Sequence, residues 1–135
     1  MKILVSRCLL GERCRYDGKR IPDAEVIALG REHTLIPVCP EMLGGLPCPR
    51  TPCEVRGERV VSRDGEDLTD AYRRGAEEAL RICRENGCEK AVLKARSPSC
   101  GKGIIYDGSF TGTLTAGDGV TARLLEENGI PVENR

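Results

Sequence analysis

Short apolar runs alternate along the chain with stretches whose apolar residues follow helical spacing. The runs at residues 2–6, 34–38 and 91–93 predict buried strands. From Asp67 to Cys83, apolar residues recur three and four positions apart, which predicts a long amphipathic helix. Strands that alternate with helices indicate a parallel sheet covered by helices on both faces.

Three shorter features are also predicted. One precedes the second strand, and two lie between that strand and the long helix. Pro22 and Asp23 open a helix that ends before Gly30. Residues 40–52 are rich in proline and glycine, which predicts a long ordered loop. The sequence V-R-G-E-R-V-V-S-R-D-G at residues 55–65 suggests a small hairpin or an irregular excursion.

Glycine marks the ends of the predicted helices. Asp67 is placed to cap the start of the long helix, and Asn-Gly at residues 86–87 ends it. The sequence E-N-G recurs at residues 127–129, directly before the apolar residues 130–132, so helix, glycine and strand occur twice. We therefore predict an α/β fold with a small, doubly wound, mostly parallel sheet of the flavodoxin or Rossmann kind.

Length and charge narrow the class of protein. A chain of 135 residues fits one core, so we expect residues 1–135 to form a single domain. The net charge is zero and no run of Lys or Arg stands out, which disfavours long nucleic acid or an anionic membrane as partner. The N-terminal apolar run is too short for a signal peptide, and no stretch is long enough to span a membrane. We expect a cytoplasmic protein that acts on a small molecule.

Aromatic residues are scarce, since the chain has three Tyr, one Phe and no Trp. Proteins that bind single-stranded nucleic acid stack the bases on aromatic side chains. A platform of this kind is thin here, which again favours a small ligand over long RNA. The sequence leaves the oligomeric state open.

Eight cysteines are the main chemical feature of the sequence. Cytoplasmic thiols stay reduced, so this number indicates metal binding or catalysis rather than disulfides. The only histidine, His33, lies at the end of a polar helix, where we expect a surface residue. One imidazole is too few for most Cys-His nucleophile schemes and histidine-containing zinc sites, so a metal site here would be mostly sulfur.

The predicted strands place the cysteines at two ends of the sheet. Cys8, Cys39 and Cys100 each come shortly after a strand, and the loops at the carboxyl ends of parallel strands form the ligand crevice. Further along the first two of these loops lie Cys14, Cys48 and Cys53. Cys83 and Cys88 belong to the long helix and its end, where we expect packed core side chains.

Cysteine spacing alone leaves the metal open. No C-x-x-C motif occurs, so neither a zinc ribbon nor a ferredoxin-type run is indicated. Soft thiolates favour zinc, copper(I) or an iron–sulfur cluster. Three loops with one thiolate each would leave a cubane with one iron free for a substrate, which suggests catalysis. A fully ligated cluster would suggest electron transfer or binding, and a zinc-stabilised interaction domain is a further alternative.

Three motifs give the chain a resemblance to a known family. They are S-R-C-L-L-G-E-R-C-R-Y-D-G, P-V-C-P-E-M-L-G-G-L-P-C-P-R and L-K-A-R-S-P-S-C-G-K-G-I-I-Y-D-G, and the likeness ends with G-D-G-V-T-A at residues 117–122. Over nearly its whole length the chain resembles the bacterial thiouracil desulfidases. The resemblance implies an enzyme with an oxygen-sensitive 4Fe-4S cluster held by three cysteines. Its fourth iron takes the sulfur of a thiolated pyrimidine, which leaves as hydrosulfide without net redox change.

Matching the motifs one by one implies that Cys8, Cys39 and Cys100 are the cluster ligands. Cys48 and Cys53 depart from the pattern of the family, and a thiolate from either would close the fourth iron. The implied substrate is of the thiouracil or thiouridine type, and free base, nucleoside and nucleotide all stay open.

Several residues near these cysteines are candidates for the reaction itself. Glu41, two residues after Cys39, is the first candidate for the acid or base that acts on water and on the leaving group. Ser97 and Ser99 lie just before Cys100, where their hydroxyls could bond the substrate or the cluster sulfurs. The alternatives are a carboxylate bonded to backbone amides for Glu41 and ordinary turn chemistry for the two serines.

Asp17, Arg50 and Gly101 are candidates for binding the substrate. Asp17 and Arg50 lie in loops with proline or glycine and could fix the edge of a pyrimidine, or each other. A solvated surface role is the alternative for both. Gly101 begins a G-K-G sequence that allows close approach of the backbone but lacks the spacing of a phosphate-binding loop.

Overall fold

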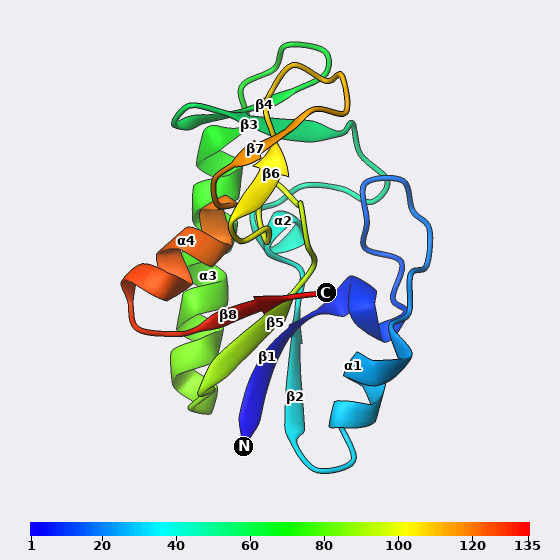
Figure 1. Ribbon diagram of the computed structural model, residues 1–135, viewed down its shortest axis with the longest axis vertical. Coiled ribbons are helices and arrows are strands. Elements are labelled where there is room, and N and C mark those ends of the chain that lie inside the picture. The colour runs from blue at the N-terminus through cyan, green and yellow to red at the C-terminus, as the bar shows by residue number, and fades with distance from the viewer.

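A four-stranded parallel sheet forms the centre of the protein (Figure 1). The computed structural model describes all of residues 1–135. In the order β2-β1-β5-β8, the strands are β2 (Thr34–Val38), β1 (Lys2–Ser6), β5 (Lys90–Leu93) and β8 (Val132–Asn134). Every neighbouring pair is parallel, with Leu4 opposite Ile36 on one side and Ala91 on the other. The predicted α/β fold with a small parallel sheet is confirmed.

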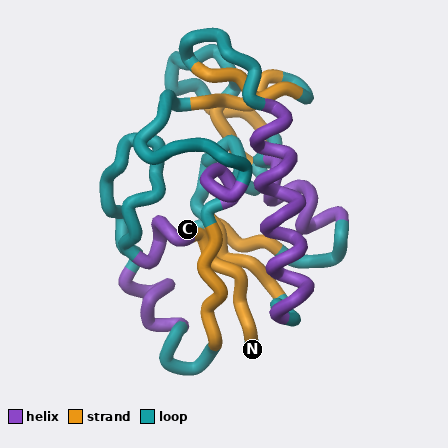
Figure 2. Tube along the Cα trace, turned by 180° about the vertical axis from the view of Figure 1, so that it is seen from behind, coloured by secondary structure: helices purple, strands orange, loops and turns teal.

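Helices cover both faces of this sheet, as Figures 1 and 2 show. They are α1 (Ala24–Leu29) on one face, and α3 (Thr69–Asn86) and α4 (Val120–Glu127) on the other. Ile3 and Val5 pack with Val26 of α1, whereas Leu4 packs with Leu80 of α3 and with residues of α4. Successive side chains of a strand point to opposite faces, so both faces of β1 are covered, which explains why Ile3, Leu4 and Val5 are all apolar and buried. No helix is long and apolar enough to cross a membrane.

The helix boundaries follow the predicted caps in most places. The Asp23 carboxylate accepts hydrogen bonds from the backbone N–H groups of Glu25 and Val26 at 3.0 and 3.1 Å, and so caps α1. Gly87 ends α3 in the left-handed region, with a φ of 66°. The N-cap position of α3 is occupied by Leu68 rather than by the predicted Asp67. The fourth strand also begins two residues later than predicted, at Val132.

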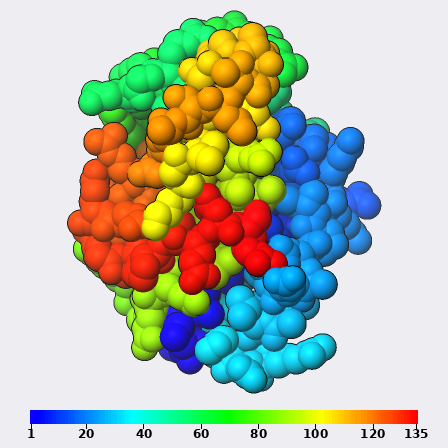
Figure 3. Space-filling view, in the orientation of Figure 1, coloured from blue at the N-terminus to red at the C-terminus, as the bar shows by residue number.

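Two antiparallel hairpins lie beyond the carboxyl edge of the sheet. The first, β3 (Cys53–Arg56) with β4 (Arg59–Ser62), confirms the hairpin expected near residues 55–65. The second, β6 (Ile104–Tyr106) with β7 (Leu114–Ala116), was not predicted. Figure 3 shows both hairpins, in green and orange, covering one end of the molecule. Two short helical turns also lie in segments expected to be loops, η1 (Arg7–Leu10) and α2 (Pro40–Leu43).

A pair of glycines allows α2 to lie directly on α3. A Cβ atom added to Gly44, at the end of α2, would come within 2.0 Å of the Ala71 carbonyl oxygen. A Cβ atom on Gly75 of α3 would come within 1.8 Å of the Pro40 carbonyl oxygen. No side chain fits at either position, so the two backbones touch. This contact fixes the loop after β2, which carries Cys39, against the long helix.

Candidate functional site

A cavity of about 620 Å³ lies between the carboxyl edge of the sheet and the two hairpins. Its walls come from the loops that follow β1, β2 and β5 and from residues of both hairpins. This is the crevice in which open parallel sheets bind ligands, because the loops after neighbouring strands converge there.

The three predicted cysteine ligands all line this cavity. Cys8 lies in η1 directly after β1, Cys39 is the N-cap residue of α2 after β2, and Cys100 lies in the loop after β5. Their exposed fractions are only 8%, 8% and 4%. The fold therefore brings three thiols from three separate loops to one enclosed space.

A further thiol, Cys14, lies beside two of these cysteines. Cys14 lines the cavity and is 3% exposed, and the Cys39 Sγ donates to its backbone carbonyl at 3.7 Å. The interaction with the Cys39 thiol lowers the pKa of Cys14, but the interaction with Cys8 and burial raise it, to about 11 overall. Cys14 stands in the same sequence motif as Cys8, yet its position after a turn, rather than after a strand, gave no reason to select it.

Two of the three predicted cysteine ligands, Cys39 and Cys100, have raised pKa values. Burial raises the pKa of the Cys100 thiol to about 12. The neighbouring Cys14 thiol and burial raise the pKa of Cys39 well above its ordinary value. A metal centre must therefore displace these protons when it binds.

The donor set fits an iron–sulfur cluster better than a single ion. No three His, Cys, Asp or Glu side chains converge closely enough to hold one metal ion, which a tetrahedral zinc site would need. A cubane takes each thiolate on a different iron, so its ligands stand farther apart than those of one ion. Cys8, Cys39 and Cys100 provide three soft donors around one cavity, as a cluster of this kind requires.

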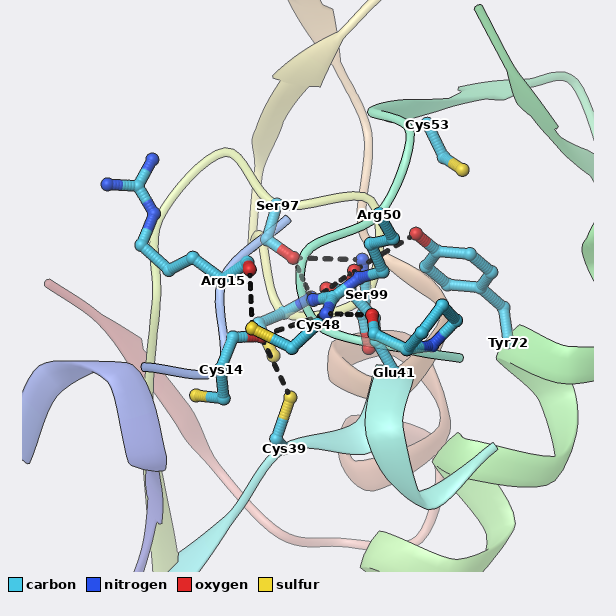
Figure 4. Close-up of polar contacts among 12 residues, drawn as sticks. Cys14, Arg15, Cys39, Glu41, Cys48, Arg50, Cys53, Tyr72, Ser97 and Ser99 are labelled. Carbon is cyan, nitrogen blue, oxygen red and sulfur yellow. Dashed lines mark hydrogen bonds and ion pairs between the residues drawn. The ribbon is translucent and has the colours of Figure 1, made fainter. Parts of the chain in front are cut away.

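Cys48 and Cys53 lie in different surroundings from the other thiols (Figure 4). Cys48 does not line the cavity, and its Sγ donates to the backbone carbonyls of Arg13 and Arg15 at 2.9 and 3.2 Å. Cys53 does line the cavity, but Figure 4 shows it beside Tyr72 and apart from Cys39. The thiol nearest to the predicted ligands is thus neither of the two that the sequence singled out.

Glu41 lines the cavity and is held by two neighbours (Figure 4). Its Oε2 atom accepts hydrogen bonds from Arg50 at 2.8 and 2.9 Å and from the Tyr72 hydroxyl at 3.1 Å. The Arg50 side chain is only 6% exposed and also donates to the Cys14 carbonyl at 2.9 Å. Arg50 therefore pairs with Glu41, and not with Asp17 as one alternative expected. Tyr72 was missed because it lies on the apolar stripe of α3, where the spacing predicts a core side chain.

The two predicted serines have different positions. Ser97 lines the cavity, and its Oγ accepts hydrogen bonds from the backbone N–H groups of Ser99 and Cys100 at 3.1 and 3.0 Å. Ser99 is completely buried outside the cavity lining, and its Oγ bonds the Thr121 hydroxyl of α4 at 2.7 Å. Only Ser97 is placed to touch a ligand.

Asp17 and Gly101 are also outside the cavity lining. The Asp17 carboxylate lies 3.4 Å from the guanidinium of Arg15, which does line the cavity, and accepts a hydrogen bond from the backbone N–H of Lys19. Gly101 is buried, and a Cβ atom there would come within 2.8 Å of the Ser97 carbonyl oxygen. The glycine is thus explained by packing within the loop after β5.

Aromatic and cationic side chains are concentrated in the lining of the cavity. All four aromatic residues of the chain line it: Tyr16, Tyr72, Tyr106 and Phe110. The few aromatic residues of the chain are therefore all found at one site. Cationic residues of the lining are Arg7, Arg15, Arg50, Arg63, Lys94, Arg96 and Arg135. The lining contains only two carboxylate side chains, Glu41 and Glu54, so cations outnumber carboxylates around the cavity.

Comparison with known proteins points to one family. The family model described as 2-thiouracil desulfurase matches residues 3–135. The chain is 40% identical over 140 residues to YbbK, an uncharacterised protein of Bacillus subtilis (strain 168), covering 96% of this chain and 93% of YbbK. It is 48% identical to the solved structure of the 4Fe-4S-dependent thiouracil desulfidase TudS, with a TM-score of 0.93, covering 99% of this chain and 90% of TudS.

Proposed function

This chain belongs to the 2-thiouracil desulfurase family, and from that premise we propose that it removes sulfur from a thiolated pyrimidine of the thiouracil or thiouridine type. The observation that carries the proposal is the meeting of Cys8, Cys39 and Cys100 at one cavity that Glu41 also lines. In the proposed reaction, water replaces the thiocarbonyl sulfur, so the products are the pyrimidine carbonyl and hydrosulfide with a proton. No electrons are gained or lost.

A 4Fe-4S cluster would be held by Cys8, Cys39 and Cys100. Bound by three cysteines, such a cluster supplies a Lewis-acidic iron that polarises the thiocarbonyl group. The chain would contribute the three thiolates and the walls of the cavity around them.

Glu41 is the proposed proton acceptor for the attacking water. Arg50 and Tyr72 both bond its Oε2 atom, which leaves Oε1 without a hydrogen-bond partner from the protein. A carboxylate with one oxygen fixed and the other free can accept a proton from water and return it to the leaving group or ring nitrogen. Because Arg50 is itself buried, the ion pair holds Glu41 in one orientation.

Ser97 is the proposed donor to the substrate. Its oxygen already accepts two backbone N–H groups, so its own hydroxyl proton is free to be donated. A hydrogen bond from Ser97 to the ring carbonyl or to the sulfur would orient the pyrimidine in the cavity.

The experiment that tests the proposed function is anaerobic reconstitution with iron and sulfide, followed by incubation with 2-thiouracil, 4-thiouracil and 4-thiouridine. We expect loss of the thiocarbonyl absorbance together with release of sulfide in equal amount. The matched control is Cys39→Ser, which should not retain the cluster. A brown, iron-loaded wild-type protein that consumes none of these compounds would contradict the proposal.

The position of Cys14 beside two predicted ligands supports a second candidate function, electron transfer by a fully ligated cluster. Cys14 is the thiol that interacts with Cys8 and Cys39, so it is the one placed to act as a fourth ligand. Under this alternative, Cys14→Ser would lower the iron content of the protein as strongly as Cys39→Ser. Under the proposed function, Cys14→Ser keeps its iron and its acid-labile sulfide.

A further inference from the structure

Phe110 differs from the other aromatic residues of the cavity. Tyr72 has a buried hydroxyl that bonds Glu41, and Tyr16 is 42% exposed beside Arg15. Phe110 has no polar atom, is half-buried and lines the cavity. Its ring can therefore contribute only apolar and π contacts, either to the protein or to a ligand.

The backbone of Phe110 lies in a region that residues with side chains rarely adopt. Its φ is 57°, and the only other residue besides glycine with a positive φ is Arg96, at 65°. Both residues line the cavity. A strained backbone persists only where the surrounding structure fixes it, and such residues cluster at functional sites.

Contacts from β3 hold the segment that carries Phe110. The Glu54 Oε1 atom accepts hydrogen bonds from the backbone N–H groups of Gly108 and Phe110 at 3.0 and 3.2 Å. Arg56 donates to the Gly108 carbonyl oxygen at 3.2 and 2.6 Å. Two charged side chains of β3 thus hold the backbone around Gly108 and Phe110.

A cation also lies against the Phe110 ring. The Arg63 guanidinium carbon is 5.8 Å from the ring centroid, within the range of a cation–π contact. Arg63 makes no ion pair with a carboxylate and also lines the cavity. The two hairpins thus bring a ring and a guanidinium together in the lining of the cavity.

We infer that Phe110 is a specificity-determining residue whose ring stacks on the heterocycle of the substrate. The inference rests on the proposed function and deepens it. A planar pyrimidine can lie flat on an aromatic ring, whereas the same thiocarbonyl on a saturated, puckered ring cannot. Phe110 therefore selects planar thiolated pyrimidines over non-aromatic compounds that present the same carbon–sulfur bond.

The test compares 2-thiouracil with its 5,6-dihydro analogue in the cluster-loaded protein. Phe110→Leu should raise KM for 2-thiouracil about tenfold, with kcat nearly unchanged, because stacking acts in substrate binding. It should leave KM for the dihydro compound unchanged, so the preference for the planar ring is lost. Phe110→Tyr should retain both values. The control is Leu114→Ala, a change of an exposed residue of the same hairpin that does not line the cavity.

A second readout does not depend on turnover. The chain has no tryptophan, so Phe110→Trp introduces a single indole at this position. We expect uracil, the desulfurated product, to quench its fluorescence, and 5,6-dihydrouracil to quench it much less. This measurement also covers the case in which Phe110→Leu folds poorly.

The two possible failures are distinguishable. A wild-type protein that consumes no thiolated pyrimidine overturns the proposed function and this inference with it. An active wild-type protein overturns the inference alone if Phe110→Leu keeps the wild-type KM and preference, or if uracil leaves the indole emission of the Phe110→Trp variant unchanged.

Discussion

Cys83 and Cys88 lie near the amino end of β5, whereas Cys8, Cys39 and Cys100 lie at the carboxyl edge of the sheet. Both groups are buried, with exposed fractions of 8% or less. Burial raises the pKa of Cys83 to about 11 and that of Cys100 to about 12. Neither burial nor thiol acidity therefore separates a packed cysteine from a proposed ligand.

Apolar neighbours do not separate the two groups either. Cys100 packs in the same core cluster as Cys83 and Cys88, which includes Leu80 and Ala91. What differs is the space in front of the thiol, because Cys100 lines the cavity whereas Cys83 and Cys88 do not. For these cysteines, the position relative to the strands therefore predicts access to the cavity better than burial or apolar neighbours do.

Cys100→Ser should have the largest effect, because it tests whether a cysteine at the carboxyl edge of the sheet binds the cluster. Replacing a thiolate with a poorly coordinating hydroxyl removes one of three ligands, so we expect near-complete loss of iron and acid-labile sulfide after reconstitution. The matched change at the other end, Cys88→Ser, should keep both. Iron and sulfide assays with visible absorbance measure the effect. Equal iron loss in both variants would mean that the position after a strand does not define the ligands.

Glu41→Gln tests whether the carboxyl edge of the sheet also provides the residue that transfers protons in the reaction. We expect kcat to fall by about 10²- to 10⁴-fold, the range for losing a general acid–base group. The cluster should remain, since Glu41 is not among its proposed ligands. Single-turnover kinetics with matched iron content measure the effect, and Glu78→Gln on the exposed side of α3 is the control. A variant with wild-type kcat would exclude Glu41 from proton transfer.

Cys83→Ser tests whether the cysteines near the amino end of β5 serve only the packing of the core. Cys83 is completely buried, and its Sγ is 3.9 Å from the nearest carbonyl acceptor, that of Cys88. A hydroxyl there would be poorly bonded, so we expect unfolding to become easier by about 1–3 kcal/mol. Denaturant unfolding of the cluster-free protein gives this value, and Cys83→Ala separates the polar cost from lost packing. Iron content should not change, and a loss of iron would place Cys83 in the cluster site.

Much of this architecture could be predicted because the signals are local. Apolar runs gave β1, β2 and β5, and helical spacing gave α3, since these patterns reflect burial on one or both faces. The hairpin of β6 and β7 was missed because β7 has only three residues and is exposed along its whole length, so no buried run marks it. Asp67 lies one residue before the N-cap position of α3, yet its carboxylate accepts hydrogen bonds from the backbone N–H and the hydroxyl of Thr69, the first residue of the helix.

The candidate site was predictable only as far as it follows the strands. Three cysteines and Glu41 lie in the segments that follow β1, β2 and β5, and all four line the cavity. Cys14 and Phe110 reach it through irregular loops whose path depends on contacts with distant segments, such as that from Glu54 to Phe110. Spacing along the sequence contains no information about such contacts.

Tyr72→Phe should give a smaller effect than loss of Glu41 itself. The change removes one hydrogen bond to Glu41 and leaves both bonds from Arg50 in place. We expect kcat to fall about tenfold with KM unchanged, which corresponds to about 1.4 kcal/mol of positioning energy. A purely structural role would lower the stability without this separation of kcat from KM. Steady-state kinetics and thermal unfolding of the same preparation distinguish the two.

Cys48→Ser should have the smallest effect, although Cys48 lies in a loop beside the cavity. Cys48 is outside the cavity lining, its Sγ donates to the backbone carbonyls of Arg13 and Arg15, and a serine hydroxyl can donate to the same acceptors. We expect a change in unfolding free energy within about 0.5 kcal/mol and an unchanged iron content. If Cys48→Ser instead lost iron while Cys14→Ser kept it, the loop after β2 would provide a fourth ligand. That result would mean that a thiol outside the cavity lining can still become a cluster ligand.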